Sequence, residues 1–303
     1  MTQTVLILGG SGRIGTHAAA AFWDAGWAVR HFDRKTDNMT QAARGVDVIV
    51  NGMNPANYHN WAKTIPAITH QVIAAAKASG ATVIIPGNVY NFGDRGGQFD
   101  ETTPQTPNTR KGQIRKEMEQ AYRDAGVPTI ILRAGNFLDP NRNGDIQSLL
   151  ILKSAHKGIV TTLGDPDVPQ AHAYLPDWAR AAVMLAEKRS TLDVFEDIPF
   201  PGHTFTMRDL AVAVESRTGK PMRLKRFPWW SVTLMAPFWE LMREFREMRY
   251  LNDMPHWLGT DKFDRLLPEF QATDLQTAML AGLAGDINPD QSVGTGRKTI
   301  AAQ

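Results

Sequence analysis

Three glycines at a fixed spacing near the N-terminus constrain the fold of this chain more than any other feature. Gly9, Gly12 and Gly15 directly follow the apolar run Thr4–Leu8 and open a helical pattern of small residues. Glycine permits a tight turn and a close approach of backbone to phosphate, and a helix start adds free N–H groups with partial positive charge. The segment therefore predicts a strand–turn–helix unit that binds a pyrophosphate. The predicted cofactor contacts in it are Gly9, Gly12, Arg13, Ile14 and Gly15.

An acidic residue stands where a dinucleotide site needs one. Asp33 follows the second apolar run, Trp27–Phe32, and lies 18 residues beyond Gly15. A carboxylate at this place accepts hydrogen bonds from the adenosine ribose, which favours NAD. Arg34 and Lys35 come next and would instead hold a 2′-phosphate, which favours NADP. Because the carboxylate would repel that phosphate, we favour NAD and keep NADP open.

Strand-like apolar runs alternate with helical patterns through the first half of the chain. After the first two runs, strands are predicted at 46–50, 81–85 and 128–132, and helices at 65–79 and 112–125, with Thr64 as the cap of the first. Strands rich in Val and Ile that alternate with helices are typical of βαβ units around a parallel sheet. The predicted fold class is therefore α/β, with a Rossmann-type doubly wound parallel sheet.

The alternation ends after Pro140, where we predict a smaller, mainly helical substrate lobe. Residues 1–140 together with about 170–190 form the expected dinucleotide-binding domain. The lobe is expected from about 141–169 and 197–285. The polar and small residues at 286–303 predict a flexible tail.

Composition excludes several classes of protein. The 303 residues include no cysteine, which removes disulfide scaffolds, iron–sulfur sites and thiol nucleophiles. A balance of 33 basic to 31 acidic residues gives +2, too little for a nucleic-acid footprint. No histidine pair has metal-ligand spacing, so no metal site is predicted, and His172 is expected to be structural. With neither a signal peptide nor a membrane span evident, we expect a cytoplasmic protein.

The same residues resemble the short-chain dehydrogenase/reductase superfamily, in its extended and atypical branch of NAD-dependent epimerase/dehydratase-like enzymes. The glycine spacing is the G-x-x-G-x-x-G of that branch. The further matches are Val89-Tyr90 to its V-Y-G segment, Arg133–Phe137 to its R-x-x-N stretch, and Tyr174–Ala179 to its V-x-D-V-A element. The resemblance covers about residues 4–190 and implies an NAD(P)-dependent oxidoreductase or epimerase-like enzyme.

The catalytic residues of that family do not carry over directly. Its Ser or Thr position, four residues before the tyrosine of the Val-Tyr pair, is Pro86 here. Its Tyr-x-x-x-Lys pair aligns with Lys111 and Arg115 or, in a shifted alignment, with Pro107 and Lys111. Both alignments lose the phenol that moves the hydroxyl proton in the family.

Tyr90 and Lys111 are the candidate proton carriers that remain. Tyr90 follows the fourth strand, whose carboxyl end faces the nicotinamide in doubly wound sheets. A lysine acts as acid or base only when its pKa falls from about 10.4, and Arg115 is a positive neighbour of Lys111 one helical turn away. Lys111 and Asn88 are also candidate cofactor ligands, and Asn136 and Tyr90 are candidate substrate contacts. Each of these residues also has a purely structural interpretation. Tyr90 would pack as an aromatic side chain, Lys111 and Arg115 would be solvated helix charges, and Asn88 and Asn136 would be turn residues.

The segment Phe227–Trp257 contains four of the eight tryptophans. Its apolar residues follow helical spacing among arginines and glutamates. Trp229 and Trp230 are candidates for a roof over a small, partly apolar substrate. A core-facing helix, a homodimer contact and a membrane-surface contact are the alternatives.

The predicted function is that of an NAD(P)-dependent oxidoreductase or epimerase-like enzyme acting on a small, partly apolar hydroxyl or carbonyl compound. The missing Ser and Tyr leave an alternative, a dinucleotide-binding sensor or assembly factor without turnover. A small-molecule substrate is the expected partner, and nucleic acid is not.

Overall fold

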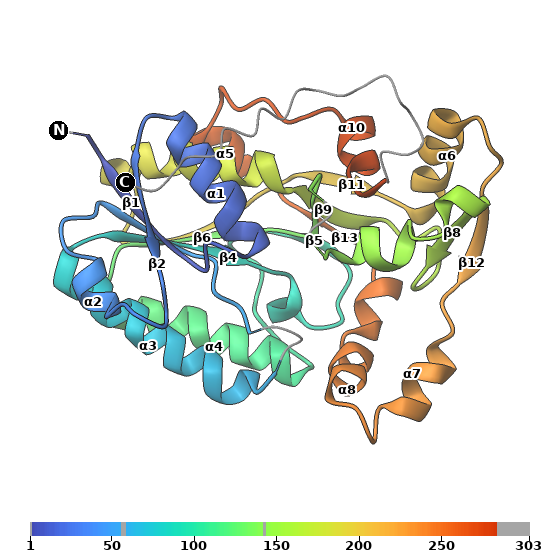
Figure 1. Ribbon diagram of the computed structural model, residues 1–303, viewed down its shortest axis with the longest axis horizontal. Coiled ribbons are helices and arrows are strands. Elements are labelled where there is room, and N and C mark those ends of the chain that lie inside the picture. Colours follow the sequence, from blue (N-terminus) through green and yellow to red (C-terminus); the bar gives the residue numbers. More distant parts are fainter. Residues whose placement is uncertain (1, 56–58, 142–143, 284–303) are drawn as a thin grey trace.

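A six-stranded sheet forms the centre of the molecule, as predicted (Figure 1). The computed structural model describes residues 2–55, 59–141 and 144–283, so the expected tail at 286–303 lies outside the described residues. All neighbouring strands of the sheet are parallel. Their order across the sheet is β2 (Ala28–Phe32), β1 (Thr4–Leu8), β3 (Val48–Asn51), β4 (Thr82–Gly87), β6 (Thr129–Arg133) and β10 (Phe195–Pro199).

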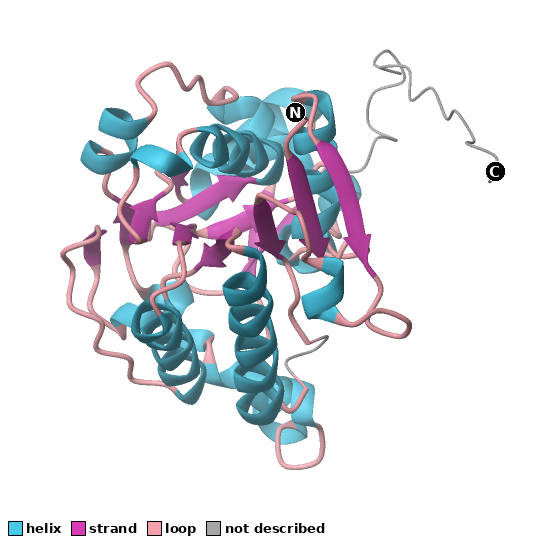
Figure 2. Cartoon of the chain, turned by 90° about the vertical axis from the view of Figure 1, so that its left-hand side faces the viewer, coloured by secondary structure: helices cyan, strands magenta, loops and turns pink. Residues whose placement is uncertain are grey.

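Helices cover both faces of this sheet (Figure 2). Successive side chains of a strand point to opposite faces, so Val5 and Ile7 of β1 join one buried cluster and Leu6 and Leu8 join the other. The helices on the first face are α1 (Arg13–Asp24) and α5 (Leu175–Glu187). Those on the second face are α2 (Met39–Ala42), α3 (Trp61–Ser79) and α4 (Arg110–Ala125). The sheet is buried on both sides, which explains its continuous apolar strands.

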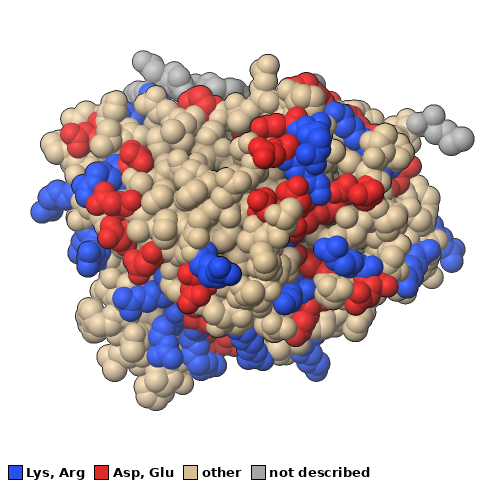
Figure 3. Space-filling view, turned by 180° about the vertical axis from the view of Figure 1, so that it is seen from behind, with Lys and Arg blue, Asp and Glu red and all other residues tan. Residues whose placement is uncertain are grey.

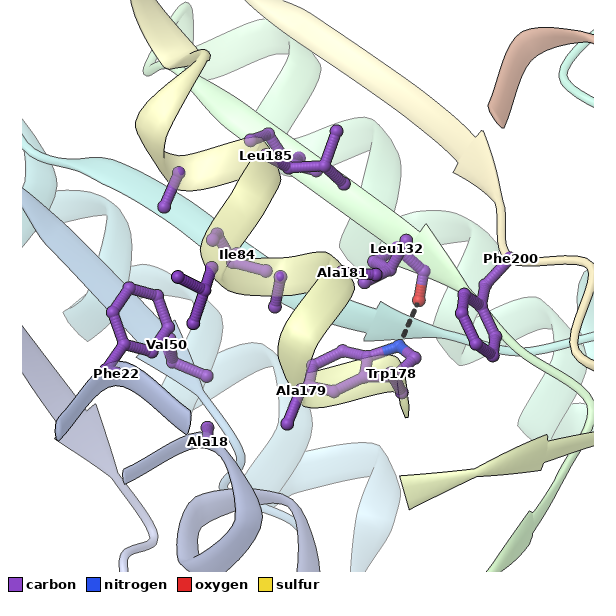
Figure 4. Packing of buried hydrophobic residues seen from close by; sticks show 14 of the residues in the cluster. Ala18, Phe22, Val50, Ile84, Leu132, Trp178, Ala179, Ala181, Leu185 and Phe200 are labelled. Carbon is purple, nitrogen blue, oxygen red and sulfur yellow. Dashed lines mark hydrogen bonds between the residues drawn. The ribbon is translucent and has the colours of Figure 1, made fainter. Parts of the chain in front are cut away.

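Trp178 of α5 anchors the first face (Figure 4). The side chain is fully buried, and its indole N–H donates to the carbonyl oxygen of Leu132 in β6 at 3.1 Å. Phe137 packs against the ring edge-on. The indole therefore buries a large apolar surface without leaving its one polar atom unpaired.

Helix boundaries differ from prediction at α3. The helix begins at Trp61 rather than at residue 65, so Thr64 lies inside it and does not cap it. Asn60 precedes the helix in a left-handed conformation with φ of 50°, which asparagine tolerates and the prediction overlooked. The stop at Gly80 is confirmed: φ is 73° and its N–H donates to the Ala76 carbonyl.

The smaller lobe contains strands as well as helices. Outside the central sheet, the strands form a three-stranded sheet, β7 (Asn136–Leu138), β9 (Gln170–Tyr174) and β11 (His203–Phe205), and the pairs β8 (Ile159–Thr162) with β12 (Arg223–Arg226) and β5 (Gly97–Phe99) with β13 (His256–Leu258). The helices of the lobe are α6 (Met207–Thr218), α7 (Trp229–Met235), α8 (Glu240–Glu247) and α10 (Leu275–Met279). The short 3-10 and π turns are Tyr90–Phe92, Gln147–Ile151, Ala155–Lys157, Arg189–Thr191, Arg249–Asp253 and Leu280–Gly282.

Two segments expected in the lobe instead belong to the central sheet and its cover. β10 extends the sheet to Pro199, beyond the expected boundary at 197. α9 (Asp261–Leu266) packs Phe263 against Phe200 in the buried cluster on the α1–α5 face. None of the helices in the described part of the chain combines the length and apolar character that crossing a bilayer requires.

Arg133, at the end of β6, ties the last strands of the sheet to α4. Its fully buried guanidinium contacts the carboxylates of Glu119 at 2.7 Å and Asp197 at 2.6 Å. It also donates to the backbone carbonyl of Asn88 at 2.6 Å. One cation therefore joins two carboxylates and holds the loop after β4.

Replacing Arg133 with methionine should lower the free energy of unfolding by about 3–5 kcal/mol, because buried Glu119 then keeps a charge without its partner. Urea denaturation measures the change. Arg110→Met, at an exposed position in the same helix α4, is the control and should change stability by less than about 0.5 kcal/mol. Equal effects of the two substitutions would contradict this account of Arg133.

Candidate functional site

The direction of the chain reverses between β1 and β3. From β1 the chain passes to β2 on one side and then returns to β3 on the other side of β1. In doubly wound sheets, ligands bind outside the carboxyl ends of the strands at such a switch point. The glycine turn that begins at Gly9 follows β1 at this edge. The segment that begins at Gly52 follows β3 at the same edge.

Backbone packs directly against backbone at this point. Gly9 has φ of 77° and its carbonyl oxygen accepts from the N–H of Gly12 at 2.9 Å. A Cβ on Gly15 would overlap the Gly9 carbonyl oxygen, and a Cβ on Gly9 would lie 3.0 Å from the Gly52 carbonyl. The glycine spacing is thus required by contacts within the fold. Gly52 was missed by sequence reasoning, since its partners become visible only when β1 and β3 are adjacent.

The first turn of α1 is free of a side-chain cap. Its N-cap residue is Gly12, and no side-chain hydrogen bond closes the helix start. The N–H groups of Arg13, Ile14 and Gly15 have no acceptor within the helix, because the first turn of any α-helix leaves them unpaired. This glycine-lined helix start fits a phosphate group, which would accept from those N–H groups.

Asp33 lies at the same edge as the glycine turn. The register pairs Leu8 with Phe32, so the residues that follow, Gly9 and Asp33, leave adjacent strands together. The exposed Asp33 carboxylate accepts from the N–H of Lys35 at 2.9 Å, and the N–H of Asp33 donates to Asp37 at 2.8 Å. The turn thus holds a carboxylate beside the phosphate cradle.

Lys111 is buried in contacts with α8. Its Nζ lies 2.7 Å from a carboxylate oxygen of Glu247, and it also contacts the carboxylate and the backbone carbonyl of Glu244. The three N–H bonds of the ammonium thus have three acceptors on one helix. A contact from this ammonium to ribose or substrate would require exchange of these bonds, and both predicted roles stay predictions. Sequence reasoning missed the glutamates because they are more than 130 residues away.

Tyr90, Asn88 and Arg115 gather at the carboxyl ends of β3 and β4. Asn88 accepts from the backbone N–H of Tyr90 at 3.0 Å, and the first turn of α4 packs tightly on the Tyr90 carbonyl at Gly112. Arg115 donates to Asn54, in the loop after β3, at 3.3 Å and stacks over Trp61. The structure therefore brings these three predicted residues to the cofactor edge of the sheet.

A pocket lies beside β7 and β9. Its first lining residue, Asn136, is three residues beyond the end of β6. Asn136, Gln170 and His172 contribute polar groups to it, and Asn136 donates to Gln170 at 3.4 Å. The apolar lining residues are Phe137, Leu138, Ile146, Ile151, Leu163, Val168 and Met207. Asp165 is the charged residue among the described lining residues, which include neither lysine nor arginine.

Trp229 and Trp230 do not act as a pair. Trp229 is buried behind the pocket, and its indole N–H donates to the carbonyl of Leu163, a lining residue, at 2.6 Å. Trp230 is 72% exposed and is not among the described lining residues. Consecutive helical residues point about 100° apart, so one ring supports the pocket wall and the other faces outward. The expected roof of two tryptophans is corrected to a wall buttressed by Trp229.

Comparison with known proteins agrees with this geometry. A model of the NAD dependent epimerase/dehydratase family matches residues 5–198. The chain belongs to this family. The resemblance inferred from the glycine spacing is thereby confirmed. No curated protein matches the sequence.

Solved structures of members of this fold cover most of the chain. UDP-glucuronic acid 4-epimerase from Bacillus cereus, in complex with UDP-glucuronic acid and NAD, has a TM-score of 0.74 at 15% identity, covering 92% of this chain and 98% of its own. A putative epimerase from Burkholderia cenocepacia J2315 has 0.71 at 17%, covering 91% and 95%. The Bordetella bronchiseptica enzyme WbmH, in complex with NAD+, has 0.68 at 15%, covering 93% and 97%. Identities this low show a shared fold.

In this member of the epimerase/dehydratase family, a buried histidine borders the pocket. His172 stacks on Phe205 at 3.8 Å, and its Nδ1 donates to the Gln170 carbonyl at 2.8 Å. Burial lowers the pKa of His172 to about 3, and the charges of His256 and His203 act in the same direction against that hydrogen bond. The ring is therefore neutral in the folded protein at neutral pH.

Acid should destabilise the fold through His172. The unfolded chain takes up a proton near pH 6.5 and the folded chain only near pH 3, so stability falls as pH decreases through this window. From pH 6.5 to pH 5 the contribution is about 2 kcal/mol. Urea denaturation across this range should show a shallower pH dependence for His172→Asn than for the unaltered chain. His70→Asn, at an exposed position in α3, is the control, and parallel curves for all three proteins would contradict the prediction.

Proposed function

We propose that this chain is an NAD(P)-dependent oxidoreductase or epimerase-like enzyme that acts on a small, partly apolar hydroxyl or carbonyl compound. The observation that carries the proposal is the uncapped first turn of α1, packed through glycine onto the ends of β1 and β3. A phosphate at this point would satisfy backbone N–H groups that the fold leaves available. Asp33 at the same edge supports NAD as the cofactor.

The chain offers ligands for the pyrophosphate and for the adenosine ribose of a dinucleotide. The ligands we propose are the backbone of Gly9, Gly12, Arg13, Ile14 and Gly15 for the pyrophosphate, Asp33 for the ribose, and Arg34 for the 2′-phosphate if the cofactor is NADP. When bound, the nicotinamide accepts a hydride from a carbinol carbon or returns one to a carbonyl carbon. The residues around it must orient that carbon and move the accompanying hydroxyl proton.

Tyr90 is the proposed proton carrier. It follows β4 directly at the carboxyl edge of the sheet, and Asn88 holds its backbone in place. Its phenol would protonate a carbonyl oxygen during reduction, and its phenolate would take up the hydroxyl proton during oxidation. Arg115 at the same edge would stabilise negative charge on that oxygen. Lys111 is retained as a second carrier for a state in which α8 releases its ammonium.

The pocket lining supports a substrate without a diphosphate. Apolar side chains form most of the wall, and the described lining carries a carboxylate but neither lysine nor arginine. A diphosphate bound there would lose hydration without gaining a counter-ion, which is costly. Asn136 and Gln170 would instead hold neutral hydroxyl or carbonyl groups. The Bacillus cereus neighbour binds UDP-glucuronic acid, so we propose a change of substrate class on a shared fold.

One observation favours a second candidate, a dinucleotide-binding sensor without turnover. The ammonium of Lys111, which aligns with the catalytic pair of the family, is held by α8.

The cytoplasmic location and a homodimeric state are further predictions.

Cofactor binding should stabilise the fold. NAD at roughly 100 times its Kd should raise the free energy of unfolding by about 2.7 kcal/mol, measurable as a rise in melting temperature. Asp33→Asn should weaken NAD binding by about tenfold, since a charge-assisted hydrogen bond is lost, and should not weaken NADP binding. Asp24→Asn, an exposed acid at the end of α1, is the matched control. If none of NAD, NADH, NADP and NADPH shifts the melting temperature, the proposed function is wrong.

Hydride transfer should depend on the Tyr90 phenol. In a screen of alcohols and carbonyl compounds followed by NADH absorbance, Tyr90→Phe should reduce kcat by about 100-fold or more, with little change in cofactor binding. Tyr174→Phe, another half-buried tyrosine, is the control. Binding of NAD without turnover of any substrate in the unaltered chain would favour the sensor instead.

A further inference from the structure

A hairpin of two helices, α7 and α8, projects from the lower right of the molecule (Figure 1). It carries five of the twelve large apolar side chains that are exposed in the described residues. We call these five residues the apolar tip: Trp230 (72% exposed), Leu234 (64%), Met235 (43%), Phe238 (86%) and Trp239 (50%). They lie within ten consecutive positions, so they form one patch rather than scattered surface residues.

Three residues of the apolar tip, Trp230, Leu234 and Met235, lie on helix α7, which already packs through other residues. Trp229 and Val232 of α7 are buried against Leu163 in a small cluster of their own. Trp230 and Leu234, four residues apart, lie together on another face of α7. A surface helix with one buried face normally presents polar residues elsewhere. A helix that is apolar on two faces indicates a second contact.

The acidic and basic side chains of α8 lie on different sides of the helix, and this distribution indicates the charge of a partner. Its three glutamates face the body of the protein, where Glu240 pairs with His59 at 2.8 Å and Glu244 and Glu247 hold Lys111. Arg243 and Arg246 of the same helix are exposed. Lys111 offsets one of the two negative charges of Glu244 and Glu247, whereas Arg243 and Arg246 present positive charge on the exposed surface of the hairpin.

The strand that leads into the hairpin adds to this charge. Arg223, Lys225 and Arg226 of β12 are exposed and directly precede α7. Seen from behind, the hairpin forms the lower left of the molecule, and lysine and arginine side chains gather beside its uncharged surface (Figure 3). An apolar surface flanked by cations has the chemistry of a segment that binds at a membrane surface.

We propose that the apolar tip docks on the surface of an anionic lipid bilayer. The indoles of Trp230 and Trp239 and the ring of Phe238 enter the interfacial layer, where aromatic side chains are favoured. The arginines and lysine beside them bind lipid phosphates. This property goes beyond the proposed function, because it needs neither cofactor nor substrate.

Charge argues against a second copy of the chain as the occupant. A two-fold contact through the apolar tip would place the cationic surroundings of the tip on one copy beside those of the other. Like charges juxtaposed in an interface oppose association. A bilayer with anionic headgroups supplies the opposite charge.

Vesicle flotation without cofactor tests the proposal. The unaltered chain should float with vesicles of phosphatidylcholine and phosphatidylglycerol, and much less with phosphatidylcholine alone or at high salt, where the attraction is screened. Trp230→Ser combined with Phe238→Ser should reduce binding by at least about tenfold. Arg243→Gln combined with Arg246→Gln should reduce binding roughly 25-fold, about fivefold for each cation. Trp23→Ser, which removes an indole 70% exposed on α1, is the matched control and should float like the unaltered chain.

A measurement on the unaltered chain keeps the test independent of variant folding. Brominated phosphatidylglycerol should quench tryptophan fluorescence when Trp230 and Trp239 enter the interfacial layer. Absence of flotation and of quenching overturns the proposal, as does equal flotation of the apolar double variant when its melting temperature is unchanged. Sedimentation analysis tests for self-association of the chain. If the chain self-associates without binding vesicles, and the apolar double variant abolishes the association, the apolar tip binds a second copy and the proposal is overturned.

Discussion

Backbone packs on backbone where β1, β3 and α1 meet, and the cofactor edge of the molecule depends on this contact. A Cβ on Gly15 would overlap the Gly9 carbonyl, and a Cβ on Gly9 or Gly52 would lie only 3.0–3.1 Å from the neighbouring backbone. The contact draws the start of α1 over the ends of two strands and directs its unpaired N–H groups to the switch point. Asp33, on the neighbouring strand, then lies at the same edge. Two of the glycines that form this contact, Gly9 and Gly15, are therefore also residues that we propose for binding the phosphate.

A second constraint joins the lobe to this edge. The buried ammonium of Lys111 needs acceptors, and Glu244 and Glu247 of α8 supply them. The same helix turns Glu240 toward His59, so the hairpin is fastened to the starts of both α3 and α4. Its first residue, Trp229, supports the pocket wall at Leu163. One small hairpin thus supports the pocket wall, holds the start of α4 and leaves its arginines exposed.

The central sheet was predictable because its signals are local. Buried parallel strands read as short apolar runs, and glycine stops such as Gly80 follow from the left-handed conformation that glycine adopts without strain. The start of α3 was mispredicted because the prediction overlooked Asn60, a residue type that tolerates the left-handed conformation seen there. Of the predicted site residues, the glycine turn and Asp33 come together with Asn88, Tyr90 and Arg115. Trp230 does not line the pocket, since adjacent helical residues point in different directions.

The amino-acid sequence by itself determined the fold class, the glycine turn, the acidic residue after the second strand and the family, because each depends on spacing within a few tens of residues. Tertiary structure decided the partners of Lys111, the order of the strands, the uncharged character of most of the pocket and the outward charge of the hairpin. These depend on groups that are distant in the chain and adjacent only after folding. The sequence shows which side chains are charged. Whether a charged group pairs with another group of the protein or stays exposed to a partner depends on the residues that pack beside it.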